Sequence, residues 1–274
     1  MILVTGATGH LGRLVISHLV KKVPSSQVIA GVRTPGKAAD LGVPVRELDY
    51  NRPATVEAAL KGVDQVLLIS SSEFGNRAGQ HQVVIDAAKQ AGVKLLAYTG
   101  VLNSDTSKLA LAADHQATEK ALRASGVPFV MLRNGWYHEN YTGSLATVLQ
   151  HGVMLGAAGN GKLAPAARVD FAEAAVAVLT TPGHEGKAYE LAGDRAYTLA
   201  ELAAEVARVG GKPVAYRNLP AAEYAATLKS FGLPPAFAEL LADSDVGIER
   251  GDLNDSSGTL RRLIGRPTTP FADV

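Results

Sequence analysis

The sequence predicts a doubly wound α/β domain, in which helices cover both faces of a parallel β-sheet. Six short runs of valine, isoleucine, leucine and aromatic residues alternate with longer segments of helical period between residues 2 and 132. Each run is followed by turn-forming residues, as expected of strands buried on both faces of a parallel sheet. Strands and helices that alternate at this spacing indicate crossover connections between parallel strands.

The apolar runs are the expected strands, and the segments between them are the expected helices. We expect strands at residues 2–4, 28–32, 45–48, 66–69, 95–98 and 129–132. We expect helices at residues 11–20, 54–60, 79–91 and 109–124. Pro53 lies near the first turn of one helix, and Gly92 and Gly126 lie just after the last turns of two others.

The alternation stops after Arg133. Residues 134–161 are rich in glycine and contain the single tryptophan of the chain. A helix at 169–179 and a strand at 188–191 then return to the earlier pattern. The chain therefore leaves the sheet and comes back to it.

The C-terminal third is predicted to be helical. Thr198 and Glu201 fit a capping box, and two glycines at 210 and 211 mark the end of that helix. Further short amphipathic helices are expected at 221–230 and 235–242. We expect two domains, a larger one of residues 1–133 and about 162–194, and a smaller, mostly helical one of about 134–161 and 195–274.

The composition is that of a globular chain and excludes several classes of protein. Hydrophobic residues make up 47% and charged residues 19% of the 274 positions, which excludes a disordered chain and a coiled coil. The 27 lysines and arginines balance 26 acidic residues, so we expect no nucleic-acid partner. The chain has no cysteine, which excludes disulfides and thiolate chemistry and fits a cytoplasmic location. Without a basic leader or a run of ~18 apolar residues, we expect no signal peptide and no membrane span.

A glycine-rich turn connects the first strand to the first helix. Gly6, Gly9 and Gly12 follow the first apolar run directly, in the spacing GxxGxxG. Such a turn needs residues without a Cβ, so that the backbone can approach a pyrophosphate and the helix N-terminus can direct its N–H groups at it. The alternative is an ordinary glycine-rich turn. The position at the start of a strand–loop–helix unit favours a dinucleotide site.

The residues at the end of the second strand indicate which dinucleotide the chain binds. NAD-binding domains carry Asp or Glu about 20 residues after the loop. This chain has Arg33 there, and Lys37 follows. A guanidinium suits the 2′-phosphate of NADP, so we expect NADPH rather than NADH. The alternative is a solvated arginine at a strand end.

Other polar residues follow the next three strands. Asp49 either accepts from the adenine amino group or caps the next helix. Ser70–Ser72 and Thr99 lie where strands reach the carboxyl edge of the sheet, at which open α/β folds bind ligands. These residues could equally serve the turns themselves.

The catalytic pair of most short-chain dehydrogenases is absent. None of the eight tyrosines is followed by lysine four residues later. His115 and Glu119 lie one helical turn apart, and we expect an exposed surface pair rather than an acid–base couple. Lys120 could reach a ribose hydroxyl. The seven histidines show no metal-ligand spacing, so we expect no metal site.

Several motifs resemble one family. They are TGATGHLG at 5–12, Arg33, LLISSSE at 67–73, RNGWYHEN at 133–140, AAGNGK at 157–162, YELAGD at 189–194, LADSDVG at 241–247 and LIGRPTT at 263–269. Together they are similar to the type 2 NAD(P)H:quinone oxidoreductases, of the NmrA-like branch of atypical short-chain dehydrogenases. The resemblance implies a Rossmann domain and a small C-terminal domain with a cleft between them. It also implies reduction of quinones by NADPH without flavin or metal.

The resemblance also implies site residues, although it leaves the catalytic residues unknown. The implied cofactor contacts are Gly6, Ala7, Thr8, Gly9, His10 and Leu11 in the phosphate loop, Arg33 at the 2′-phosphate, Ser70, Ser71 and Phe74 beside the cofactor, Asn134, Tyr137 and Asn140 near the nicotinamide, and Arg168 at a phosphate or ribose. The implied substrate contacts are Phe74, Tyr137 and His138. The chain departs from the family pattern at His10, where the family has glutamine, and at His138, where the family has serine.

The missing Tyr/Lys pair fits a quinone substrate. A quinone is a strong electrophile, and water can protonate its oxygens once hydride has arrived, so orientation of the ring could supply most of the catalysis. Trp136, Tyr137 and Phe74 are then aromatic walls, or else core residues. The alternative function is an NADP(H)-binding redox sensor without turnover. The sequence leaves the oligomeric state open, a homodimer included.

Overall fold

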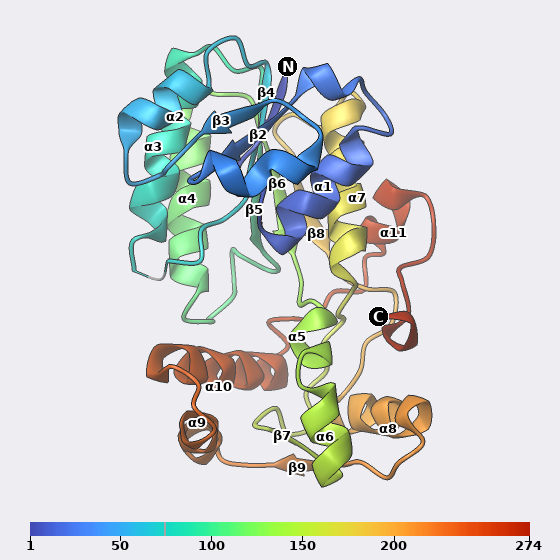
Figure 1. The fold of residues 1–274 in the computed structure, drawn as a ribbon. Helices are drawn as coiled ribbons and strands as arrows, with labels where there is room; N and C mark the ends of the chain where they lie inside the picture. The colour runs from blue at the N-terminus through green and yellow to red at the C-terminus, as the bar shows by residue number, and fades with distance from the viewer. Residues whose placement is uncertain (74) are drawn as a thin grey trace.

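A parallel sheet forms the upper part of the molecule (Figure 1). The structure is a computed structural model and describes residues 1–73 and 75–274. Within them, the sheet has the strand order β3-β2-β1-β4-β5-β6-β8, and all of its pairs are parallel. The strands are β1 (Ile2–Val4), β2 (Val28–Val32), β3 (Val45–Glu47), β4 (Gln65–Leu68), β5 (Leu95–Val101), β6 (Phe129–Asn134) and β8 (Ala188–Leu191). The predicted doubly wound α/β fold is confirmed.

Two layers of helices cover the sheet. One face carries α2 (Pro53–Ala59), α3 (Arg77–Gln90) and α4 (Ala112–Ser125). The other carries α1 (His10–Leu19), α7 (Arg168–Thr180) and α11 (Thr259–Ile264). Within β1, Leu3 joins the first core, and Ile2 and Val4 join the second. This alternation is the period of a strand buried on both faces.

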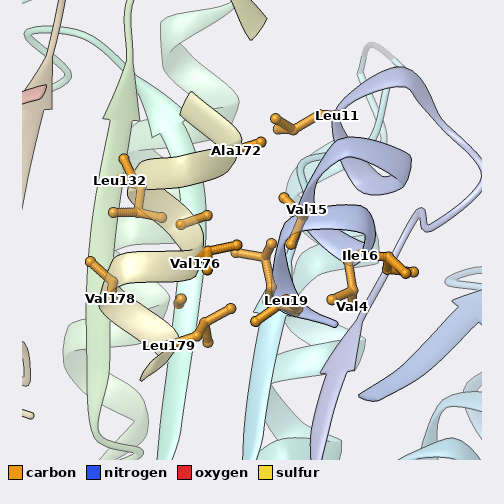
Figure 2. Packing of buried hydrophobic residues seen from close by; sticks show 14 of the residues in the cluster. Val4, Leu11, Val15, Ile16, Leu19, Leu132, Ala172, Val176, Val178 and Leu179 are labelled. Carbon is orange, nitrogen blue, oxygen red and sulfur yellow. The ribbon is translucent and has the colours of Figure 1, made fainter. Parts of the chain in front are cut away.

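Helices α1 and α7 pack directly against each other (Figure 2). Leu11 and Val15 of α1 lie opposite Ala172 and Val176 of α7. All four side chains are buried and belong to one hydrophobic cluster. The packing therefore fixes the N-terminus of α7 relative to the glycine-rich turn before α1.

A smaller unit lies below the sheet (Figure 1). Its helices are α5 (Glu139–Thr142), α6 (Leu145–His151), α8 (Leu199–Gly210), α9 (Ala221–Ser230) and α10 (Pro235–Arg250), and β7 (Val153–Gly156) pairs with β9 (Ala215–Asn218). The unit is mostly helical, as predicted. The predicted capping box is also confirmed, because the Thr198 hydroxyl accepts from Glu201 N and the Glu201 carboxylate accepts from Thr198 N.

Some element bounds differ from those predicted. The sequence did not indicate the β7–β9 pair, because β9 is short and largely exposed. Helix α10 extends eight residues beyond the expected end at 242, because Ser244 and Asp245 are polar but buried and mask the helical period. Strand β5 continues through Thr99 and Gly100, which pair with β6 and so are not turn residues.

The C-terminal strap, residues 266–271, runs between the two units. Arg266 Nη2 lies 2.7 Å from Asp170 Oδ1, and Thr269 N donates to Asp170 Oδ2 at 2.9 Å, so the strap is attached to α7. Phe271 is buried in the core of the smaller unit. Helix α11, which the predicted division places in the smaller domain, packs on α7 in the larger unit. The division itself stays a prediction.

In the described ranges, 1–73 and 75–274, we find no helix with both the length and the apolar character that a membrane crossing needs.

Candidate active site

A pocket of about 310 Å³ opens at the carboxyl edge of the sheet. It lies beyond the ends of β1, β4 and β5, between the N-termini of α1 and α7. Ligands bind at this edge in open α/β sheets. The described residues that line it are Gly6, Gly9, His10, Leu11, Gly12, Ile69, Ser70, Ser71, Ser72, Arg77, Thr99, Tyr137 and Arg168.

The glycine-rich turn has the geometry that its spacing predicts. Gly6 has φ +58°, a conformation that favours glycine, and its carbonyl accepts from Gly9 N at 2.9 Å. A Cβ on Gly12 would lie 2.4 Å from Gly6 O, so the turn itself requires glycine there. A Cβ on Gly9 would lie 3.2 Å from the same oxygen, a contact that a small shift relieves. Gly9 is exposed and lines the pocket.

The N-terminus of α1 is free to bind an anion. Gly9 is its N-cap, and among the described residues no side chain caps it. The first turn contains no acidic residue. N–H groups and the helix dipole therefore present positive charge to the pocket. Arg168, the first residue of α7, adds a guanidinium from the opposite side.

Side-chain hydroxyls connect the strand ends below the pocket. Thr5 Oγ1 lies 2.6 Å from Tyr50 Oη and accepts from Ile69 N at 2.9 Å. Thr99 Oγ1 accepts from Ser70 N at 2.9 Å. Thr99 therefore supports the turn after β4 and also lines the pocket. The sequence indicated the position of Thr99 but not this partner.

Two buried side chains of α3 hold the Ser71 backbone. His81 Nε2 accepts from Ser71 N at 3.0 Å, and Arg77 Nε donates to Ser71 O at 2.6 Å. Because Nε2 accepts, the neutral His81 ring carries its proton on Nδ1, 2.9 Å from Thr118 Oγ1. Burial, and then the charge of Arg77, lower the pKa of His81 to about 3. Sequence reasoning missed both residues, because nothing local relates them to the turn.

The prediction that His115 and Glu119 form an exposed surface pair is wrong, because both side chains are buried. His115 is 5% exposed and Glu119 1%. Arg77 Nη1 donates to His115 Nε2 at 3.2 Å, and Tyr98 Oη lies 2.6 Å from His115 Nδ1. Glu119 instead accepts two hydrogen bonds from Arg133, at 2.6 and 2.9 Å. Neither residue lines the pocket as the described residues form it, and Lys120 is exposed.

Tyr137 forms one wall of the pocket. Its ring packs edge-on against Phe171 at 5.1 Å between centroids, and the Arg168 guanidinium carbon lies 4.7 Å from its centroid. Its hydroxyl accepts from Asn134 Nδ2 at 3.3 Å. Burial raises the pKa of Tyr137. The phenol therefore stays neutral, and its ring is held in one orientation.

Other predicted site residues lie outside this lining. Arg33 is exposed at the end of β2 and pairs with Glu73, and Asn140 is exposed on α5. His138 is 2% exposed; its Nε2 lies 3.2 Å from Thr269 O, and its ring packs on Phe271, so it contacts the C-terminal strap. Phe74 lies outside the described residues. Ala7 and Thr8 belong to the glycine-rich turn without lining the pocket as described.

The structure also bears on the alternative roles predicted for Asp49 and Trp136. Asp49 Oδ1 accepts from Asn51 N at 3.0 Å, and Arg52 is the N-cap of α2, so Asp49 shapes the turn and does not cap the helix. Trp136 packs against the core of the smaller unit, as a core residue. Across the described part of the chain, no group of three or more His, Asp or Glu could hold a metal ion.

Comparison with models of known protein families shows which family this chain belongs to. The NAD(P)H-binding family matches residues 6–182. The chain belongs to this family. It is 56% identical to Quinone oxidoreductase 2 of Escherichia coli strain K12 over 276 aligned positions, which cover 100% of this chain and 96% of that protein. The predicted resemblance to the type 2 quinone oxidoreductases is confirmed.

Solved structures agree with this relationship. The crystal structure of NADPH-dependent quinone oxidoreductase QOR2 from Escherichia coli, complexed with NADPH, matches with a TM-score of 0.97 and 56% identity, over 99% of this chain and 97% of that chain. The Citrobacter sp. triphenylmethane reductase complexed with NADP(H) matches with a TM-score of 0.95 and 40% identity, over 100% of this chain and 98% of that chain.

Proposed function

We propose that this chain reduces quinones with NADPH, by direct hydride transfer from the nicotinamide and without flavin or metal. The observation that carries the proposal is the 56% identity over the whole chain to a quinone oxidoreductase. The pocket supports it, because it combines an uncapped helix N-terminus with the cation of Arg168 and an aromatic wall. We also propose a cytoplasmic location, since a chain without cysteine suits a reducing compartment.

The residues of the larger unit hold the cofactor in this proposal. The first-turn N–H groups of α1 bind the pyrophosphate, and Arg168 adds a positive charge at the same place. Arg33 binds the 2′-phosphate, for which its exposed guanidinium is suited. Ser70 and Ser71, held by Thr99, His81 and Arg77, line the pocket beside the cofactor.

The chain's main contribution to the reaction is orientation. NADPH supplies the hydride when bound, and the rigid ring of Tyr137 aligns a flat substrate. Tyr137 has a raised pKa and is not followed by lysine four residues later, so we assign it a packing role and not proton transfer. Water protonates the reduced quinone. The buried His115 and Glu119 take no part, because they form the internal hydrogen bonds described above.

The test is a direct assay. Purified protein is mixed with NADPH and a series of simple quinones, without added flavin or metal, and the loss of absorbance at the nicotinamide band is followed. We expect turnover that depends on both substrates. Absence of turnover with every quinone, while NADPH still binds, would favour the redox-sensor alternative. Turnover only after flavin is added would contradict direct transfer.

A further inference from the structure

The loop after β4 places a carboxylate beside the arginine at the end of β2. Arg33 Nη1 lies 3.4 Å from Glu73 Oε1, across 40 positions of sequence. The two residues meet because β2 and β4 both pair with β1, so the loops at their carboxyl ends are close. The Arg33 side chain is 70% exposed, and Glu73 is its described ion-pair partner.

Glu73 is anchored by residues other than Arg33. Gln80 Nε2 donates to Glu73 Oε2 at 2.6 Å, and Gln80 itself is 3% exposed. Asn51 Nδ2 lies 3.5 Å from the same oxygen, and Glu73 N donates to Ser71 Oγ at 3.0 Å. An isolated surface ion pair contributes little. A carboxylate held by a buried amide keeps its charge at one place beside the pocket.

The two nicotinamide dinucleotides respond to this charge in opposite ways. A 2′-phosphate is repelled by the carboxylate and competes with it for Arg33. A 2′-hydroxyl has a proton to donate to the same carboxylate. We propose that Glu73 is a specificity-determining residue that lowers the preference of this chain for NADPH over NADH. The inference rests on the proposed function, because it takes Arg33 as the residue that receives the 2′-phosphate.

The substitution Glu73→Gln tests this inference. It keeps the size of the side chain and removes its charge. Dissociation constants for NADPH and NADH are measured by titration at low ionic strength, where charge effects are least screened. We expect the ratio Kd(NADH)/Kd(NADPH) to rise about tenfold (about 1.4 kcal/mol), with tighter NADPH and no gain for NADH. Glu239→Gln is the matched control, because Glu239 is an exposed glutamate that pairs with Lys229 at 2.7 Å in the smaller unit.

Arg33→Ala separates the two ways in which the inference can fail. If Arg33→Ala weakens NADPH alone and Glu73→Gln leaves the ratio unchanged or lowers it, the role of Glu73 is refuted and the assignment of Arg33 stands. If Arg33→Ala changes both cofactors equally or neither, Arg33 does not receive the 2′-phosphate. The role proposed for Glu73 is then refuted as well.

Discussion

Arg133 is a charged residue in the interior of the molecule, at 4% exposure. Although burial opposes its charge, hydrogen bonds with Glu119, Asp105 and Glu190 raise the pKa of Arg133. The guanidinium contacts both oxygens of Glu119, so it is a bidentate pair. Arg133 belongs to RNGWYHEN, one of the motifs that resemble the family, and its contacts indicate that it stabilises the fold rather than touching the cofactor.

Breaking this pair should destabilise the chain strongly. Without Glu119, the buried guanidinium loses two hydrogen bonds to a charged group, each contributing about 1.5–3 kcal/mol, so the total cost is about 3–6 kcal/mol even though Asp105 and Glu190 still contact Arg133. We expect Glu119→Ala to lower the free energy of unfolding by about that amount, measured by urea denaturation. Glu239→Ala, which removes the exposed partner of Lys229, should cost less than about 1 kcal/mol. Similar small losses for both variants would contradict the buried pair.

Single substitutions at His115 and Tyr137 distinguish proton transfer from orientation of the substrate ring. We expect His115→Ala to keep most of kcat, because its buried ring does not line the pocket. Tyr137→Ala should lose about tenfold or more, because the substrate ring loses its wall. Tyr137→Phe is the control that keeps the ring, and it should retain activity. A general acid contributes about 10²–10⁴-fold, so a loss of that size for His115→Ala would make it a proton donor after all.

At the scale of elements, the strand–loop–helix unit of β1 and α1 carries the anion site. Gly12 is required by the turn, whereas Gly9 is exposed and lines the pocket. We expect Gly9→Val to abolish NADPH binding and to leave the fold intact, because the added methyl groups occupy the place of the pyrophosphate. Binding is measured by fluorescence titration, and folding by circular dichroism. Unchanged affinity would refute the assignment of this loop.

Asp245 on helix α10 makes the stability of the fold depend on pH. Its Oδ2 accepts from Ala157 N at 2.7 Å, and burial raises the pKa of Asp245 to about 6. Between the ordinary value of 3.8 and about 6 the folded chain binds more protons than the unfolded chain, so the contribution of Asp245 to stability falls as pH rises through this window.

Asp245→Asn should remove the cost of burying an ionised carboxylate, and it keeps a side-chain oxygen that can accept from Ala157 N. We expect the variant to be more stable than the parent by about 1–3 kcal/mol above pH 7, with the difference vanishing below about pH 4. Urea denaturation at a series of pH values measures it. A difference that is independent of pH would show that Asp245 is already ionised normally in the fold.

The accuracy of sequence-based prediction also differs from element to element. Strands β1 and β2 have the predicted bounds, because each is an apolar run between turn residues, and β8 also has the predicted bounds although it contains Glu190. The phosphate loop was predictable because its three glycines, Gly6, Gly9 and Gly12, lie within seven residues of the chain. The two hydrogen bonds that hold Ser71 come from α3 and depend on tertiary packing. Periodicity alone could not indicate them.

At the scale of the whole molecule, the C-terminal strap connects the larger unit to the smaller. Asp170 is fully buried and accepts from Thr269 N and Thr269 Oγ1, both at 2.9 Å. It also pairs with Arg266. Phe271 follows and fills the core of the smaller unit. Asp170 therefore contacts this segment at two residues, and Glu173 adds a second carboxylate at Arg266.

We expect Asp170→Asn to release the strap. The amide removes the charge opposite Arg266 and cannot accept from Thr269 with both of its groups, so the free energy of unfolding should fall by about 2–4 kcal/mol. The amide of Thr269 should also exchange its hydrogen faster. Asp40→Asn, at an exposed ion pair with Arg13, should change neither measurement. Unchanged exchange at Thr269 in Asp170→Asn would show that the other contacts of the strap, such as Glu173 with Arg266, hold it without Asp170.

The packing of α1 on α7 has a consequence for synthesis on the ribosome. Helix α1 ends at Leu19, and its partner begins only at Arg168. At about 5–20 residues per second, the nascent chain waits roughly 7–30 s with the apolar stripe of α1 uncovered. During this interval the phosphate loop exists without Arg168 opposite it. The half-made protein is therefore vulnerable to aggregation and, in our proposal, unable to hold its cofactor until most of the chain has been translated.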